Sequence, residues 1–267
     1  MAKKKVFEKF DSVHEFLNTI NKRQVRESFE HHQSSQSKDT YWTGTNDYSE
    51  ATNLFMYGDK ANADKLNIVL KKIKAQGKGN ETRNNLYNSP CGFLPVVPKV
   101  LAGDPQNMLA IKKQTYRSSK VINLVYSMSC AGNVSAEAIL SNSVKLVEVI
   151  CQLEKNGYRI NLYTGDNAEL SRAETAFIIK IKDAGKYLDT LKIAYPLVNP
   201  SFLRRHAFRW METNQQVDAR GDYGRAMEGR EFREFLKDKF KNAVILSFYD
   251  IYGRNTDEIK EYIENYK

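Results

Sequence analysis

The chain has 267 residues, of which 41% are hydrophobic and 11% aromatic, and its formal net charge is +9. This apolar content is enough for a buried core and excludes a wholly disordered chain. No stretch approaches the roughly 20 apolar residues that a membrane span requires. The basic N-terminus, MAKKKVFEKF, also lacks the apolar segment of a secretory signal. We therefore expect a cytoplasmic protein with no membrane partner.

The positive charge is concentrated in the first part of the chain. Residues 1–120 hold 20 Lys and Arg against 12 Asp and Glu, whereas residues 121–267 hold 21 against 20. A basic surplus suits nucleic acid or another acidic surface, and it also occurs as ordinary solubility charge. Both interpretations stay open.

Residues 1–119 are predicted to form a basic, mainly helical extension. Apolar residues recur at helical spacing over residues 6–20 and again over 60–75. Between them, Asp47 suits a helix start and Gly58 a helix end. Prolines at positions 90, 95, 98 and 105 then predict an extended, ordered connector to the next domain.

Residues 120–267 are predicted to form an α/β core domain. Strands are expected at residues 121–128, 158–164, 176–182 and 243–249, and a long helix from Ser135 to Asn156, ended by Gly157. Further helices are expected at 186–194, from Pro200 to Trp210, at 230–240 and from Thr256. The succession of strand, helix and strand predicts a parallel or mostly parallel doubly wound sheet.

One stretch of this core resembles a known family. INLVYSMSCAGNVSAEAILSNSVKLVEVICQLEKNGYRINLYTGD is similar to the first strand, helix and second strand of a von Willebrand factor A-type domain. That family binds a metal through Asp-x-Ser-x-Ser at the end of the first strand. Here residues 126–130 read YSMSC and supply no carboxylate, which a hard divalent cation requires. We therefore expect no metal and no cofactor.

Three further blocks resemble uncharacterised proteins of bacteriophages and prophages. They are WTGTNDYSEATNLFMYGD, PKVLAGDPQNM and LDTLKIAYPLVNPSFLRRHAFRWME. This resemblance implies an origin in a phage and a location in the host cytoplasm or the virion, but no activity.

Polar residues at the predicted strand ends are the first candidate binding site. Ligands of doubly wound sheets bind at the carboxyl edge of the strands. Ser and Asp also follow strands simply because they make turns and helix caps. The candidates are Ser127, Ser129, Asp166, Asp183 and Asp250.

The segment LRRHAFRWME carries the candidates for binding anions or nucleic acid, Arg204, Arg205, Arg209 and Trp210. Arginines can hold phosphate, and tryptophan can stack on a base. Alternatively, the segment is an amphipathic helix with Trp210 facing inward. The sequence also shows no complete catalytic constellation. Cys130, a candidate nucleophile, has no histidine nearby in sequence to act as its base.

The function predicted from these features is a non-enzymatic phage accessory protein that binds a protein partner through a metal-independent core. The alternatives are a nucleic-acid-associated phage protein and a structural or packaged protein of the virion.

Overall fold

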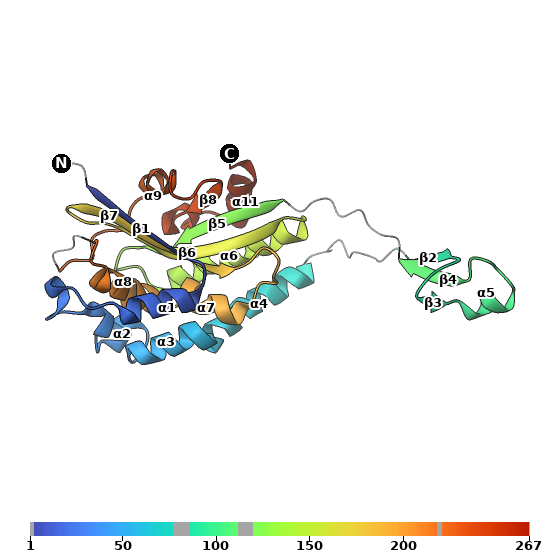
Figure 1. The fold of residues 1–267 in the computed structure, drawn as a ribbon, viewed down its shortest axis with the longest axis horizontal. Helices are drawn as coiled ribbons and strands as arrows, with labels where there is room; N and C mark the ends of the chain where they lie inside the picture. The colour runs from blue at the N-terminus through green and yellow to red at the C-terminus, as the bar shows by residue number, and fades with distance from the viewer. Residues whose placement is uncertain (1–2, 77–85, 112–119, 218–220, 267) are drawn as a thin grey trace. The chain divides into compact units, whose positions relative to one another are not determined.

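The computed structural model describes residues 3–76, 86–111, 120–217 and 221–266 (Figure 1). The chain divides into two compact units. The larger combines residues 1–73 with residues 120–267, and the smaller spans residues 74–119. The expected boundary at residue 119/120 coincides with the end of the smaller unit. Residues 1–73, expected to belong with the extension, instead belong to the larger unit, because they join its sheet and core.

A five-stranded sheet organises the larger unit, in the order β1-β7-β6-β5-β8. Its strands are β1 (Lys4–Phe10), β5 (Val121–Ser127), β6 (Arg159–Glu169), β7 (Ala173–Lys182) and β8 (Ala243–Leu246). β5 pairs in parallel with both β6 and β8, and β1 pairs in parallel with β7. The α/β class with a mostly parallel sheet is confirmed.

The pairing of β6 with β7 is antiparallel, contrary to a uniformly parallel arrangement. Only Leu170 to Arg172 separate the two strands. Because a parallel crossover needs a dozen or more residues, so short a connection permits only a hairpin.

The prediction of one helix over residues 6–20 is wrong, since this segment forms strand β1 and then helix α1 (Val13–Lys22). Val6 and Phe10 both face the main core. Their spacing of four residues fits the period of a strand as well as that of a helix. The side chain of Ser12 caps the start of α1 by accepting from the backbone N–H of Glu15. The N-terminal part is therefore not only helical.

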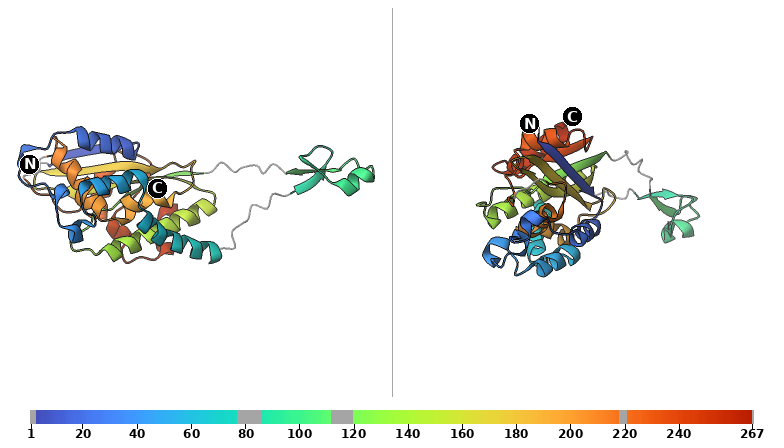
Figure 2. Two further views of the ribbon diagram at one scale, coloured as in Figure 1. Left: turned by 90° about the horizontal axis from the view of Figure 1, so that it is seen from below. Right: turned by 60° about the vertical axis from the view of Figure 1, so that its left-hand side comes forward.

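Helices cover the two faces of this sheet unequally (Figures 1 and 2). Leu124 and Tyr126 of β5 face a large core, whereas Val125 faces a smaller one beneath α9 (Gly229–Leu236). Elements that contribute to the large core include α1, α3 (Tyr48–Tyr57), α4 (Lys60–Gln76), α6 (Ala136–Lys155), α7 (Thr190–Val198), η3 (Phe202–Ala207, a π-helix), α8 (Phe208–Thr213), α10 (Phe248–Ile251) and α11 (Thr256–Asn265).

Several predicted element ends can be compared with the structure. Helix α6 begins after Ser135 and ends at Lys155, with Asn156 as its C-cap. Gly157, the next residue, has a φ of 92°, as its predicted role in ending the helix requires. Strand β8 is shorter than predicted because the Ser247 side chain caps α10 directly after it. The helix predicted at residues 186–194 lies instead at Thr190–Val198.

The smaller unit is a three-stranded antiparallel sheet, ordered β2-β4-β3, with one short helix. Its elements are β2 (Leu86–Ser89), β3 (Leu94–Pro95), α5 (Val97–Leu101) and β4 (Met108–Ile111). The proline-rich segment thus belongs to a compact unit rather than to a plain connector. Across the described parts of the chain, no helix is long and apolar enough to cross a membrane.

Candidate functional site

The carboxyl end of β5 brings together three of the predicted site residues. Ser127 is the last residue of β5 and pairs with Gly165 on the parallel strand β6. Ser129 follows β5, and Asp166 follows Gly165 on β6. Parallel pairing places the ends of both segments at one edge of the sheet.

Hydrogen bonds join these side chains into one buried cluster. The Ser129 hydroxyl donates to Oδ1 of Asp166, and it lies 3.0 Å from the Ser127 hydroxyl oxygen. Asn167 donates its side-chain amide to Ser127 Oγ at 2.7 Å and its backbone N–H to Ser129 Oγ at 2.6 Å. Both hydroxyls are therefore occupied by neighbours within the protein.

Asn167 is the member of this cluster that sequence reasoning missed. Its side-chain oxygen accepts from the backbone N–H of Met227 at 2.7 Å, which ties a distant loop to the strand ends. The only signal in the sequence was its position beside Asp166. Its role depends on the register of β6, which local patterns do not fix.

Asp166 is the one acidic member of the cluster, and only 7% of its surface is exposed to solvent. Burial raises its pKa to about 7, although hydrogen bonds from Ser129 and from the Asn167 backbone act in the opposite direction. This carboxyl group therefore titrates near neutral pH. Within the described ranges, no three His, Cys, Asp or Glu side chains gather as a set of metal ligands.

A pocket of about 240 Å³ opens on the cluster. Ser129, Asp166 and Asn167 form part of its wall, together with Cys130 and Arg204.

Arg204 is the cationic side chain that lines this pocket. Its guanidinium donates to the backbone carbonyl oxygen of Trp42 and, at 3.4 Å, to that of Gly132. It also lies over the indole ring of Trp42, 5.1 Å from the ring centroid. The pocket therefore combines one titratable carboxyl group with one oriented guanidinium.

Asp183 does not join this site, so its predicted placement is wrong. It follows β7, whose antiparallel direction carries it to the opposite end of the sheet, where Lys182 pairs with Leu162. There it forms ion pairs with Lys180 at 3.3 Å and Lys186 at 3.1 Å. Hydrogen bonds from Lys186 and Lys180 hold its pKa below the usual range.

Asp250 lies after β8 as predicted, but its carboxylate serves a helix start. It accepts from the Ser247 backbone N–H and hydroxyl, each at 2.8 Å, in the capping box of α10. It also pairs with Arg233 at 2.9 Å. The alternative reading, that such residues cap helices, describes its contacts.

The arginine-rich segment is mostly buried, which contradicts a nucleic-acid surface built on Arg205 and Trp210. Both residues are 0% exposed. The Trp210 indole N–H donates to Glu8 Oε2 at 2.7 Å. The centroid of its ring lies 5.1 Å from the centroid of the Phe177 ring. Trp210 therefore has no free face for a base.

Arg209 is half-buried and donates to the side-chain oxygen of Gln33 at 2.9 Å. Of the four predicted anion-binding residues, only Arg204 lines the pocket at the end of β5.

Cys130 and His206 do not form a catalytic pair in the described parts of the chain. Burial, reinforced by Asp166, raises the pKa of the Cys130 thiol to about 11. The His206 ring bonds to the Tyr195 hydroxyl at 2.8 Å and the Thr52 hydroxyl at 3.2 Å, and burial lowers its pKa to about 3. At neutral pH the thiol is protonated and the imidazole is neutral.

The chain is therefore an α/β protein with a polar site at the carboxyl end of β5, beside the neighbouring strand β6. The full chain, residues 1–267, matches the family described as a domain of unknown function, DUF7192, and belongs to that family. No curated protein and no solved structure matches the chain.

Proposed function

We propose that this chain is a non-enzymatic, von Willebrand A-like accessory protein of phage origin, which binds a protein partner without a metal. The observation that carries the proposal is the closed cluster of Ser127, Ser129, Asp166 and Asn167, with Arg204 lining the same pocket as three of its members. The pocket offers an oriented guanidinium, whereas the resembled family offers a metal ion.

The connections between strands support the von Willebrand A-like part of the proposal. β5 leads through α6 to the parallel strand β6, β7 returns antiparallel, and β8 pairs on the other side of β5. The strand order turns back at β5, and such points are where open α/β sheets bind ligands. Ser127 and Ser129 lie where the family's metal-binding motif would lie.

Arg204 supports recognition of a carboxylate on the partner. Carbonyl oxygens of Trp42 and Gly132 orient its guanidinium, whose five N–H groups suit a carboxylate's paired oxygens. Burial favours the neutral form of Asp166 up to about pH 7, which weakens competition from an internal anion. An aspartate or glutamate side chain of the partner is therefore the proposed ligand.

Affinity capture with the full-length chain tests this proposal. The tagged protein is expressed in infected cells, and partners are quantified by mass spectrometry in parallel captures without and with EDTA. We expect a stoichiometric protein partner that Arg204→Gln loses and that the matched surface variant Lys192→Gln retains. The proposal fails if no stoichiometric partner is recovered, if EDTA releases it, or if Arg204→Gln still binds it.

The nucleic-acid alternative now rests on a different surface. Lys5, Lys9, Lys180 and Lys239 each lie within about 6 Å of an aromatic ring on or beside the sheet face that carries α9. However, the first three of these lysines also pair with carboxylates. An oligonucleotide titration at about 50 mM salt decides this alternative, because phosphate contacts are strongest at low salt. Mass spectrometry of purified particles decides the virion alternative.

A further inference from the structure

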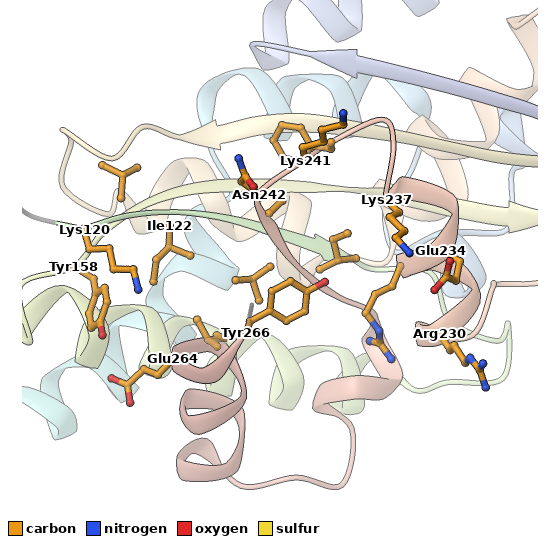
Figure 3. Close-up of a pocket in the computed structure, with 17 residues that line it drawn as sticks. Lys120, Ile122, Tyr158, Arg230, Glu234, Lys237, Lys241, Asn242, Glu264 and Tyr266 are labelled. Carbon is orange, nitrogen blue, oxygen red and sulfur yellow. The ribbon is translucent and has the colours of Figure 1, made fainter.

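A groove of about 650 Å³ runs beside β8, away from the pocket at the end of β5 (Figure 3). Its walls come from the start of β5, the loop before β8, helix α9 and the last turn of α11. β8 pairs with β5 only from Asn123 onward, so the start of β5 extends past it. There Val121 is 55% exposed, an apolar side chain at the mouth of the groove.

Strand β8 forms part of the groove wall. β8 is the last strand of the sheet, and Ala243, Val244 and Ile245 line the groove. Backbone N–H and C=O groups of alternate residues in a strand point to opposite sides, so half of those in β8 point away from β5. An edge of this kind is a template for one more strand.

The charged side chains that line the groove are mainly basic. The groove is lined by Lys120, Arg230, Arg233, Lys237 and Lys241, against Glu234 and Glu264. Arg233 is already paired with Asp250. Figure 3 shows Lys120 at one end of the groove and Arg230 and Lys237 on the α9 side. The remaining cations therefore come from three separate elements on different sides of the edge.

We propose that this groove binds an extended acidic segment of a protein partner, which adds to the sheet along β8. Backbone hydrogen bonds would hold the segment, and its acidic side chains would meet Lys120, Arg230 and Lys237. The chain's own acidic stretch does not suit this role, because Asp257 to Glu264 form helix α11, which packs on α6.

Nucleic acid fits the groove less well than an acidic peptide. Glu234 and Glu264 would repel a phosphate backbone, whereas a peptide can place uncharged residues opposite them. Only a peptide also matches the alternating donors and acceptors of the strand edge.

A selection from a random ten-residue peptide library, displayed on ribosomes, tests the inference on the full-length chain. We expect an enriched pool with Asp or Glu at alternate positions. The double variant Arg230→Glu/Lys237→Glu should bind an enriched peptide at least about tenfold more weakly, and the control Lys192→Glu should bind it unchanged. Circular dichroism and thermal unfolding confirm that both variants are folded.

Two further measurements separate strand addition from simple charge attraction. Two versions of the enriched peptide are N-methylated, one at its odd residues and one at its even residues. The version whose methyl groups face β8 should no longer bind, and the other should bind as before. Arg204→Gln should leave this binding intact, so the groove can fail or succeed independently of the pocket at the end of β5. The inference is overturned by a pool without acidic residues, by binding that survives the double charge reversal or N-methylation in both versions, or by a single-stranded oligonucleotide that displaces the peptide at equal concentration.

Discussion

Replacing Arg205 with methionine should be among the most destabilising single changes in this protein. The Arg205 side chain is fully buried, and its guanidinium holds the loop around η2 (Ser34–Gln36) and α2 (Thr40–Thr43) against η3. Its Nε donates to Thr45 Oγ1 at 2.7 Å, and its two terminal nitrogens donate to the carbonyl oxygens of Thr45 at 2.8 Å and Ser35 at 3.0 Å. Further bonds reach Thr43 Oγ1 at 3.0 Å and the Ser37 carbonyl at 3.3 Å.

The magnitude follows from the carbonyl oxygens that lose a donor. Each buried carbonyl left without a donor costs about 1–3 kcal/mol. The carbonyls of Ser35, Ser37 and Thr45 each lose the guanidinium, and that of Thr45 keeps a second donor, the Thr43 hydroxyl at 2.9 Å. Removing the cost of burying a charge offsets part of this sum. We therefore expect Arg205→Met to lower the free energy of unfolding by about 4 kcal/mol.

Urea unfolding followed by circular dichroism measures this loss. The matched control is Arg254→Met, because Arg254 is exposed and its loss should change stability by no more than about 0.5 kcal/mol. The transition midpoint should fall while its slope stays the same. If the free energies of unfolding of the two variants lie within about 1 kcal/mol of each other, the Ser35 to Thr45 loop does not depend on this guanidinium.

The other predictions concern pH, backbone conformation and metal. The folded state of Asp166 holds a proton that the unfolded chain releases between about pH 4 and 7, so this residue should reduce stability by up to about 4 kcal/mol as pH rises through that window. Urea unfolding at pH 4.5 and 7.5 should show this loss in the wild type, and Asp166→Asn should lack it; equal pH dependence in both proteins would contradict the raised pKa. Gly157→Val should cost at least about 1 kcal/mol in thermal unfolding through its φ of 92° alone, because an added Cβ there meets no atom within 4 Å. Gly185→Val, at an equally open position without a positive φ, is its control, and equal stability of the two variants would disprove a backbone origin. Calorimetry with magnesium, calcium and manganese should detect no binding at micromolar concentrations, and a signal abolished by Asp166→Ala would reverse this expectation.

Sequence reasoning reached part of the candidate site. Ser127, Ser129 and Asp166 were predicted to meet because they end consecutive strands of a βαβ unit, and the right-handed crossover fixes their relative places. Asp183 was misplaced because nothing in its own strand reveals that the strand runs antiparallel. Arg205 and Trp210 were open to two readings, since a helical pattern shows which residues share a face but not what covers that face.

Local sequence patterns are enough to predict the α/β class, the long helix between Ser135 and Gly157 and the strands from Val121 onward. These features depend on apolar periodicity, caps and glycine conformation, which are local properties. Long-range packing, in contrast, makes residues 4–10 an edge strand and brings a guanidinium into one pocket with Asp166. It also forms the basic groove beside β8. Those outcomes depend on pairing and packing between residues far apart in the chain, and such contacts leave no periodic trace in any one segment.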